Sequence, residues 1–312
     1  MQIAIGYGQI KEETCQLTRE NNHPLDKTFV YQYNNNSCIT KVKEYAYATG
    51  TPTGTAVAKN IDKMSTSEMM RVMQDENLNA VKAIESELDA IGKAVDLISE
   101  RMAQGGRLFY IGCGTSGRLG VVDASECPPT YGVPHGLVVG IIAGGDGAIR
   151  KAVEGAEDSR EAGYRDLSAY SLTELDSVIG ISVAGGAAYV LGAFDLAEEV
   201  GALKIALSCN ENCPIEKVAD VGIHPDTGAE VVTGSTRMKA GSAHKMILNM
   251  ISTAVMVKAG HVYENLMINL RPSNIKLRDR MIRIVCDITG KDYETSEKLL
   301  EENNFVIREA IK

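Results

Sequence analysis

Hydrophobic residues recur every three or four positions between residues 65 and 105. The apolar positions with this spacing are Met69, Val72, Met73, Val81, Ile84, Leu88, Ile91, Val95 and Ile98. This period predicts two amphipathic helices. Ser65 or Ser67 is placed to cap the first helix, and Gly105 and Gly106 are placed to end the second.

After residue 106 the pattern changes to short apolar runs that alternate with helical segments. The runs are RLFYIGC (107–113), GLVVGIIAGG (136–145), DSVIGISVAGG (176–186), LKIALSCN (203–210) and VGIHPD (221–226). Helices are expected over residues 116–127, 147–167, 188–201 and 242–260. This alternation predicts an α/β fold with a doubly wound, mainly parallel sheet flanked by helices. Ligands of such sheets bind beyond the carboxyl ends of the strands, where glycines cluster here.

Two further segments flank this predicted main domain at residues 65–270. Residues 1–64 are rich in Asn, Thr, Gly and Tyr, and we expect an N-terminal extension of unknown role with short strands around 29–33 and 40–47. Residues 271–312 end in TSEKLLEENNFVIREAIK, which has the period of two short helices. We therefore expect a small, partial C-terminal helical segment.

The composition argues against a nucleic-acid-binding protein and against a membrane-spanning one. The 312 residues are 44% hydrophobic with a net charge of −9 and no run rich in Lys or Arg, which argues against a nucleic-acid partner. No apolar run is long enough to span a membrane, and the first residues have no signal-peptide pattern, so we expect a cytoplasmic protein. The seven cysteines are scattered, and Cys209 and Cys213 lack metal-ligand spacing, so reduced thiols and no metal site are expected.

The first glycine loop has the spacing Gly112-x-Gly114-x-x-Gly117 of a dinucleotide fingerprint. Such a site needs an acidic residue about 20 positions further on, and Asp146 lies too far along the chain. Thr115 and Ser116 instead place hydroxyls and backbone N–H groups at a helix N-terminus, which suits a single phosphate. A tight turn without a ligand stays open as the alternative.

Four longer motifs resemble the N-acetylmuramic acid 6-phosphate etherases. These are GRLFYIGCGTSGRLGVVDASECPPTYGV, VEGAEDSREAG, AEVVTGSTRMKAGSAHKMILNMIS and NLMINLRPSN, in the family's order. The family belongs to the sugar isomerase (SIS) superfamily, which also includes the glucokinase regulatory protein. The resemblance covers about residues 65–312. It implies a SIS fold, a sugar-phosphate substrate, and elimination of D-lactate followed by addition of water, with no cofactor.

The resemblance also assigns the chemistry to two carboxylates. Glu126, at the end of the first predicted helix of the sheet domain and just before Pro128, would protonate the departing lactate oxygen and then activate water. Glu157, in the helix expected at 147–167, would take the C2 proton. Without their motifs both would be interpreted as exposed helix carboxylates. The expected substrate-binding residues are Gly114, Thr115, Ser116, Gly117, Arg118, Ser125, Ser235, Thr236 and Lys239.

The loop after the third strand departs from the family. Where the family has A-S-G-R-T-P-Y, this chain has Ala184, two glycines and two alanines before Tyr189. Charge-assisted hydrogen bonds contribute about 1.5 to 3 kcal/mol each, so a phosphate would be held less tightly. Ser182, two residues before the aligned serine, is a candidate partial substitute. A weaker etherase, an altered substrate and a degenerate site all remain open.

Two function classes follow. The etherase is favoured over a sugar-phosphate-binding regulator of the glucokinase type, because such regulators carry two SIS domains and this chain has room for one. The apolar run MILNMISTAVMV in the last long helix predicts a subunit interface, so we expect a homodimer.

Overall fold

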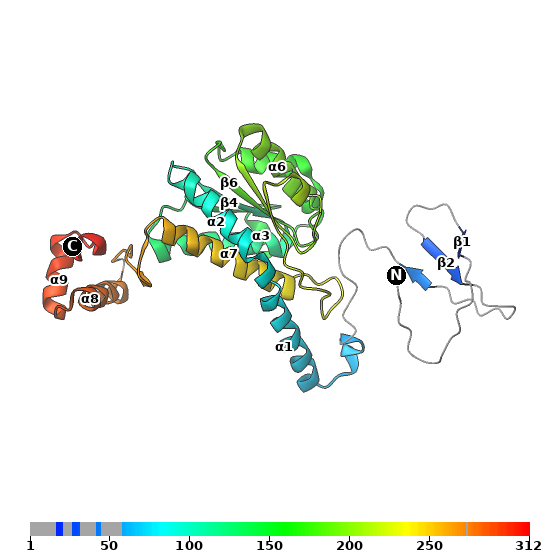
Figure 1. Cartoon of the computed structure of the whole chain (residues 1–312), viewed down its shortest axis with the longest axis horizontal. Coiled ribbons are helices and arrows are strands. Elements are labelled where there is room, and N and C mark those ends of the chain that lie inside the picture. The colour runs from blue at the N-terminus through cyan, green and yellow to red at the C-terminus, as the bar shows by residue number, and fades with distance from the viewer. Residues whose placement is uncertain (1–16, 21–26, 32–41, 45–57, 273) are drawn as a thin grey trace. The chain divides into compact units, whose positions relative to one another are not determined.

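In the computed structural model, the described residues are 17–20, 27–31, 42–44, 58–272 and 274–312. The chain divides into two units, Met1–Thr49 and Gly50–Lys312. The first contains an antiparallel sheet of β1 (Leu17–Glu20), β2 (Lys27–Tyr31) and β3 (Val42–Glu44) (Figure 1). The strands expected around 29–33 and 40–47 overlap β2 and β3, and the rest of those ranges lies outside the described residues. The boundary at residue 64 stays a prediction.

The second unit is built on a parallel five-stranded sheet with the strand order β5-β4-β6-β7-β8. Its strands are β4 (Leu108–Gly112), β5 (Val138–Ile142), β6 (Ser177–Ile181), β7 (Leu203–Leu207) and β8 (Val221–Ile223). β4, β6 and β7 are buried along their whole length, as expected of strands covered on both faces. The predicted doubly wound parallel fold is confirmed.

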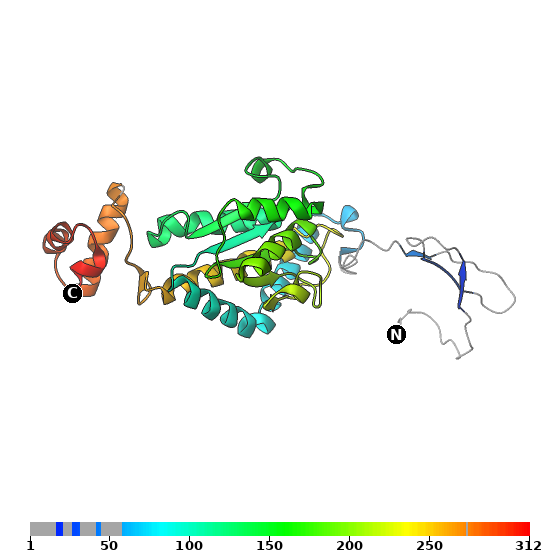
Figure 2. The ribbon, with the colours of Figure 1, turned by 90° about the horizontal axis from the view of Figure 1, so that it is seen from above.

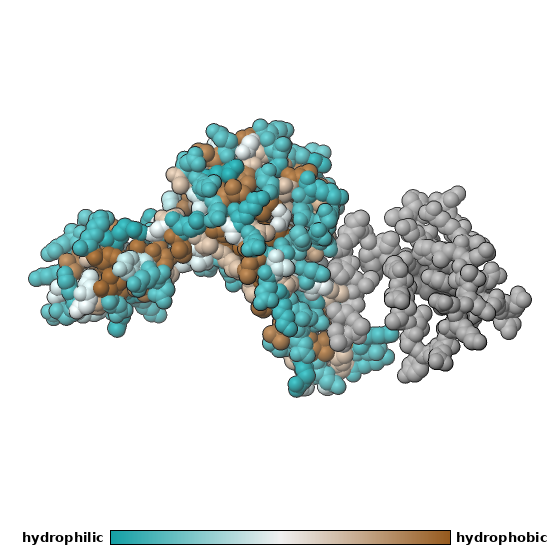
Figure 3. All heavy atoms as spheres, in the orientation of Figure 1, coloured by the Kyte–Doolittle hydropathy of each residue, from teal (hydrophilic) through white to brown (hydrophobic). Residues whose placement is uncertain are grey.

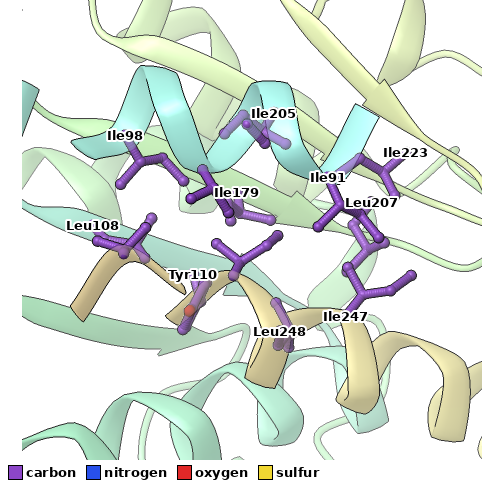
Figure 4. Packing of buried hydrophobic residues seen from close by; sticks show 14 of the residues in the cluster. Ile91, Ile98, Leu108, Tyr110, Ile179, Ile205, Leu207, Ile223, Ile247 and Leu248 are labelled. Carbon is purple, nitrogen blue, oxygen red and sulfur yellow. The ribbon is translucent and has the colours of Figure 1, made fainter. Parts of the chain in front are cut away.

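Helices cover both faces of this sheet (Figures 1 and 2). On one face lie α2 (Leu88–Met102), α3 (Gly114–Tyr131) and α7 (Lys239–Lys258), and on the other lie α5 (Arg160–Ser168) and α6 (Ala188–Val200). Figure 4 shows the core of the first face, where side chains of α2 and α7 point toward the strands. The residues labelled there are Ile91, Ile98, Leu108, Tyr110, Ile179, Ile205, Leu207, Ile223, Ile247 and Leu248.

The two leading helices are present as predicted. α1 (Thr66–Lys82) begins at a capping box in which Ser65 and Glu68 bond each other's backbone N–H groups, and α2 ends just before the predicted glycines. The short 3-10 helices η2 (Ile61–Lys63), η3 (Glu85–Glu87) and η5 (Glu216–Val218) lie in connections.

The C-terminal residues form a small helical segment with a separate core. A two-stranded hairpin, β9 (Val262–Tyr263) and β10 (Leu266–Met267), precedes α8 (Ile275–Thr289), α9 (Tyr293–Glu302) and α10 (Ile307–Ala310). α9 and α10 are the two short helices predicted, whereas α8 was not predicted. Their core residues include Met281, Val285, Leu300 and Ile307.

Two of the predicted elements are wrong in extent. The single helix expected at 147–167 is divided into α4 (Gly147–Arg150), the 3-10 helix η4 (Ala156–Asp158) and α5. Gly155 adopts a left-handed φ of 71°, and the Ser159 side chain caps the start of α5, so the chain turns between them. Glu157 therefore lies on a short turn.

The other correction concerns α3, which does not end at residue 127 as predicted. It continues through Pro128 and Pro129 to Tyr131. The prolines fall in the last turn, and Gly132, with a left-handed φ of 68°, ends the helix by donating to the Pro128 carbonyl. Glu126 thus lies inside α3.

Candidate functional site

A cavity of about 340 Å³ lies at the carboxyl ends of β4 and β6, and we call it the central cavity. The register of the two strands pairs Gly112 with Ile181, so the residues that follow, Cys113 and Ser182, leave the sheet side by side. This is the position where doubly wound sheets bind ligands. The lining residues are Cys113, Gly114, Thr115, Ser116, Glu157, Ile181, Ser182, Val183, Ala184, Ala187, Gly234, Thr236 and Gly241.

The start of α3 forms one wall of the central cavity. A Cβ at Gly117 would lie 2.5 Å from the Gly112 carbonyl oxygen, so this glycine allows the helix to begin directly against the strand end. The N-cap residue, Cys113, makes no side-chain cap bond. The first N–H groups of α3 and the hydroxyl-bearing residues Thr115 and Ser116 are therefore available to an anion.

Glu157 forms another part of the wall. It lines both the central cavity and a neighbouring cavity of about 170 Å³, together with Cys113 and Gly114. Burial, aided by the charges of Glu157 and Asp158, raises the pKa of the Cys113 thiol to about 12. The thiol therefore stays protonated beside the carboxylate at neutral pH.

Two cationic residues predicted for the site, Arg118 and Lys239, bond other groups of the protein and do not line the central cavity. The Arg118 guanidinium donates to the carbonyls of Ile149, over 2.8 Å, and Ala148, over 2.7 Å, and Arg118 lines only the smaller cavity. Lys239 is buried and forms an ion pair with the buried Glu76. Among the described lining residues of the central cavity there is no lysine or arginine.

The N-terminus of α7 already holds an anion of this chain. The buried Glu230 carboxylate accepts from the N–H groups of Lys239, over 3.2 Å, and Ala240, over 3.1 Å. A carboxylate there is stabilised by the positive end of the helix dipole. Of the predicted residues before this helix, Thr236 lines the central cavity and Ser235 does not.

Glu126 is remote from the central cavity of its own chain. It lies on α3 eleven positions after Thr115, about 16 Å along the helix axis at 1.5 Å per residue. Its side chain is exposed, as is that of Ser125, whose hydroxyl donates to the Val122 carbonyl over 2.8 Å. The structure thus gathers only part of the predicted site.

Gly114, Thr115, Ser116, Thr236 and Glu157 share the central cavity, and Gly117 packs directly behind it. Glu126, Arg118, Ser125, Ser235 and Lys239 do not line it.

Two lining residues were missed or left open by sequence reasoning. Cys113 was not predicted, although its place between the strand and the glycine turn was a usable signal. Ser182 was a candidate only, because alternation along β6 does not fix where a side chain points once the strand has ended.

The described residues contain no cluster of three or more His, Cys, Asp or Glu side chains able to hold a metal ion. Within the same residues, no helix is long and apolar enough to cross a membrane.

Comparison with known proteins identifies first the class and then the family. The family described as "Glucokinase regulatory protein N-terminal SIS domain" matches residues 90–198, which contain β4, β5 and β6 of the parallel sheet. A phosphoheptose isomerase from Francisella tularensis is 17% identical, with a TM-score of 0.49, over 62% of this chain and 100% of that one.

Two curated relatives have a much higher sequence identity to this chain than that isomerase. The N-acetylmuramic acid 6-phosphate etherase of Caldanaerobacter subterraneus subsp. tengcongensis is 54% identical over 252 residues, which are 81% of this chain and 82% of that protein. The etherase of Pectobacterium atrosepticum is 53% identical over 251 residues, 80% of this chain and 83% of that protein. The chain belongs to the N-acetylmuramic acid 6-phosphate etherase family.

Proposed function

We propose that this protein is a carbon–oxygen lyase that removes D-lactate from N-acetylmuramic acid 6-phosphate and leaves N-acetylglucosamine 6-phosphate. Such an enzyme would act in the recycling of cell-wall amino sugars. The observation that carries the proposal is the position of Glu157 in one cavity with the uncapped N-terminus of α3. A base and an anion site within one cavity are what proton removal from a phosphorylated sugar requires.

The phosphate would bind at the start of α3. Thr115 and Ser116 supply hydroxyl donors, Gly114 supplies backbone, and Gly117 lets the helix begin close to the strand. Backbone N–H groups and hydroxyls can hold a phosphate without a cation, because the helix dipole favours negative charge there. Thr236 faces the same cavity and is proposed as a contact to the sugar.

Glu157 would remove the C2 proton of the open-chain sugar. Proton loss at C2, next to the C1 aldehyde, expels the ether oxygen at C3, and this oxygen takes a proton as D-lactate leaves. Water then adds at C3, and a proton returns to C2. The departing oxygen and the incoming water need a second acid/base group, and Glu126 is proposed for it.

Glu126 would reach a cavity only across a subunit interface. It lies about 16 Å along α3 from Thr115, too far for one sugar to contact both within one chain. We propose a homodimer in which Glu126 of each subunit completes the cavity of the other. Ser125, next to Glu126, would then also meet the substrate from the second subunit.

Exposed hydrophobic residues near Glu126 support this dimer. The Asn249 amide of α7 donates to the Asp123 carboxylate of α3 over 2.6 Å, and the residues beside these two, Val122 and Met250, are exposed. Helix α1 also carries exposed hydrophobic residues, among them Met70 and Val81, and brown residues surface on this helix in Figure 3. Where such residues join into a contiguous patch, they mark a surface that packs against a partner.

Arg118 and Lys239 would support the site from behind. Arg118 fixes α4 by donating to two of its carbonyls, and Lys239 fixes α1 to α7 through Glu76. We further propose a cytoplasmic location, because the five cysteines among the described residues are free thiols.

A second candidate follows from the match to the regulatory SIS domain, namely binding of a sugar phosphate without turnover. Incubation with N-acetylmuramic acid 6-phosphate separates the two. We expect D-lactate release by the unchanged protein and a loss of at least about a hundredfold in rate for Glu157→Gln, because general bases contribute about 10² to 10⁴. Binding of the substrate without D-lactate release would favour the regulator.

A further inference from the structure

Two serine hydroxyls in the wall of the central cavity make no hydrogen bond to any residue that the structure describes. Ser116 and Ser182 are 8% and 9% exposed, and both line the cavity. Within the described part of the chain, neither side chain makes a hydrogen bond to another protein group. A hydroxyl in a cavity wall that is not bonded to the protein is free to donate, so both serines can donate hydrogen bonds to a ligand in the central cavity.

The backbone holds Ser182 in place while leaving its hydroxyl free. Its N–H donates to the Leu207 carbonyl over 3.0 Å, and its carbonyl accepts from the Gly185 N–H over 2.9 Å. Strand register places Ser182 beside Cys113, at the start of α3. A side chain fixed in this way needs little ordering when a ligand binds.

The loop after Ser182 offers no other polar side chain. Residues 183–188 are Val, Ala, Gly, Gly, Ala and Ala, and α6 begins at the N-cap Ala187 without a side-chain cap bond. Ala184 and Ala187 line the central cavity, so the N-termini of α3 and α6 both border it. Ser182 is therefore the one hydroxyl-bearing residue on the α6 side of the cavity among its described lining residues.

We propose that Ser182 is a phosphate-binding residue, which donates a hydrogen bond to the phosphate group of the sugar phosphate opposite Ser116. The phosphate then lies between the two helix N-termini and is bound by hydroxyl and backbone donors. The identity of the sugar rests on the proposed function, whereas the contact itself rests on the two unpaired hydroxyls.

The test is calorimetric titration of the full chain with N-acetylglucosamine 6-phosphate and with N-acetylglucosamine. Ser177→Ala is a matched control, because Ser177 lies at the opposite end of β6, is fully buried and also has an unpaired hydroxyl. We expect Ser182→Ala to weaken binding of the phosphorylated sugar at least about tenfold, the loss typical of a hydrogen bond to a charged group. Binding of N-acetylglucosamine should not change, and Ser177→Ala should alter neither affinity.

Equal affinity of Ser182→Ala and the unchanged protein for the phosphorylated sugar would overturn the assignment. An equal loss for both sugars would also overturn it, because the contact would then not be to phosphate. The outcome is separable from the lyase proposal. If the protein releases no D-lactate but Ser182→Ala selectively weakens binding of the phosphorylated sugar, the Ser182 contact stands and the lyase proposal fails. If the protein releases D-lactate and Ser182→Ala has no such effect, the lyase proposal stands and the Ser182 contact fails.

Discussion

The Asn249 amide donates to the Asp123 carboxylate over 2.6 Å and joins α7 to α3 three residues before Glu126. The same carboxylate accepts from the Tyr110 hydroxyl over 2.8 Å and from the Ser252 hydroxyl over 3.2 Å. Burial and the charge of Asp123 raise the pKa of Tyr110, so its hydroxyl remains a donor. This buried network fixes the part of α3 that carries Glu126.

Replacement of Asp123 by Ala should destabilise the fold. The buried donors Tyr110 and Ser252 and the half-buried donor Asn249 would lose their acceptor. One unsatisfied buried group costs about 1 to 3 kcal/mol, so the free energy of unfolding should fall by at least about 2 kcal/mol. Denaturant unfolding measures this, with Asp89→Ala, an exposed carboxylate on α2, as the control. Equal stability of the two variants would contradict the network's role.

Mixing two inactive variants should restore activity if Glu126 acts across an interface. A mixed dimer of Glu126→Gln and Glu157→Gln would contain one complete site, and half of randomly mixed dimers are of this kind, so about a quarter of the original activity should return. The measurement is D-lactate release after the subunits have been unfolded and refolded together. Activity no greater than that of the separate variants would show that the two glutamates do not combine across subunits.

His244 should make the stability depend on pH. It is fully buried, its Nε2 donates to the Ser208 carbonyl over 3.0 Å, and its Nδ1 has no partner among the described residues. Burial lowers its pKa from 6.5 to about 4. Between these values the unfolded chain binds the extra proton and the folded chain does not, so stability falls as the pH drops from about 6.5 to 4, by roughly 3 kcal/mol in all.

His244→Gln removes this titration. Thermal unfolding at several pH values should show a shallower loss of stability between pH 6.5 and 4 in the variant than in the unchanged protein. Parallel curves for the two proteins would mean that other groups cause the acid dependence.

Lys239→Met should lower the free energy of unfolding and should have little direct effect on substrate affinity. The substitution leaves Glu76 as a buried charge without its partner, which typically costs about 3 to 5 kcal/mol. Glu76→Gln in the same chain should restore part of that loss, as seen in the free energy of unfolding. A large rise in KM at unchanged stability would instead put Lys239 in contact with substrate.

Sequence reasoning predicts the sheet and part of the site. The buried runs of β4 and β6 and the glycine turn that follows β4 locate the central cavity, because parallel strands end at one edge and ligands bind there. Thr115 and Ser116 follow directly from that turn. Glu157 was linked to the cavity by its motif, although the helix expected around it was wrong.

The remaining features depend on long-range contacts. The partner of Lys239 is Glu76, 163 residues away in sequence, and no local pattern relates them. The continuation of α3 through Pro128 and Pro129 was also not predicted, because proline is usually a sign that a helix has ended. The free hydroxyl of Ser182 depends on how the chain turns after β6, which strand alternation does not determine.

We propose that the protein cleaves the ether bond of its substrate by elimination of D-lactate and then adds water at C3. The most direct measurement is incubation with N-acetylmuramic acid 6-phosphate in heavy-oxygen water, followed by mass spectrometry of both products. We expect D-lactate without the label and N-acetylglucosamine 6-phosphate with the label at C3. Label in the lactate, or no D-lactate release at all, would contradict it.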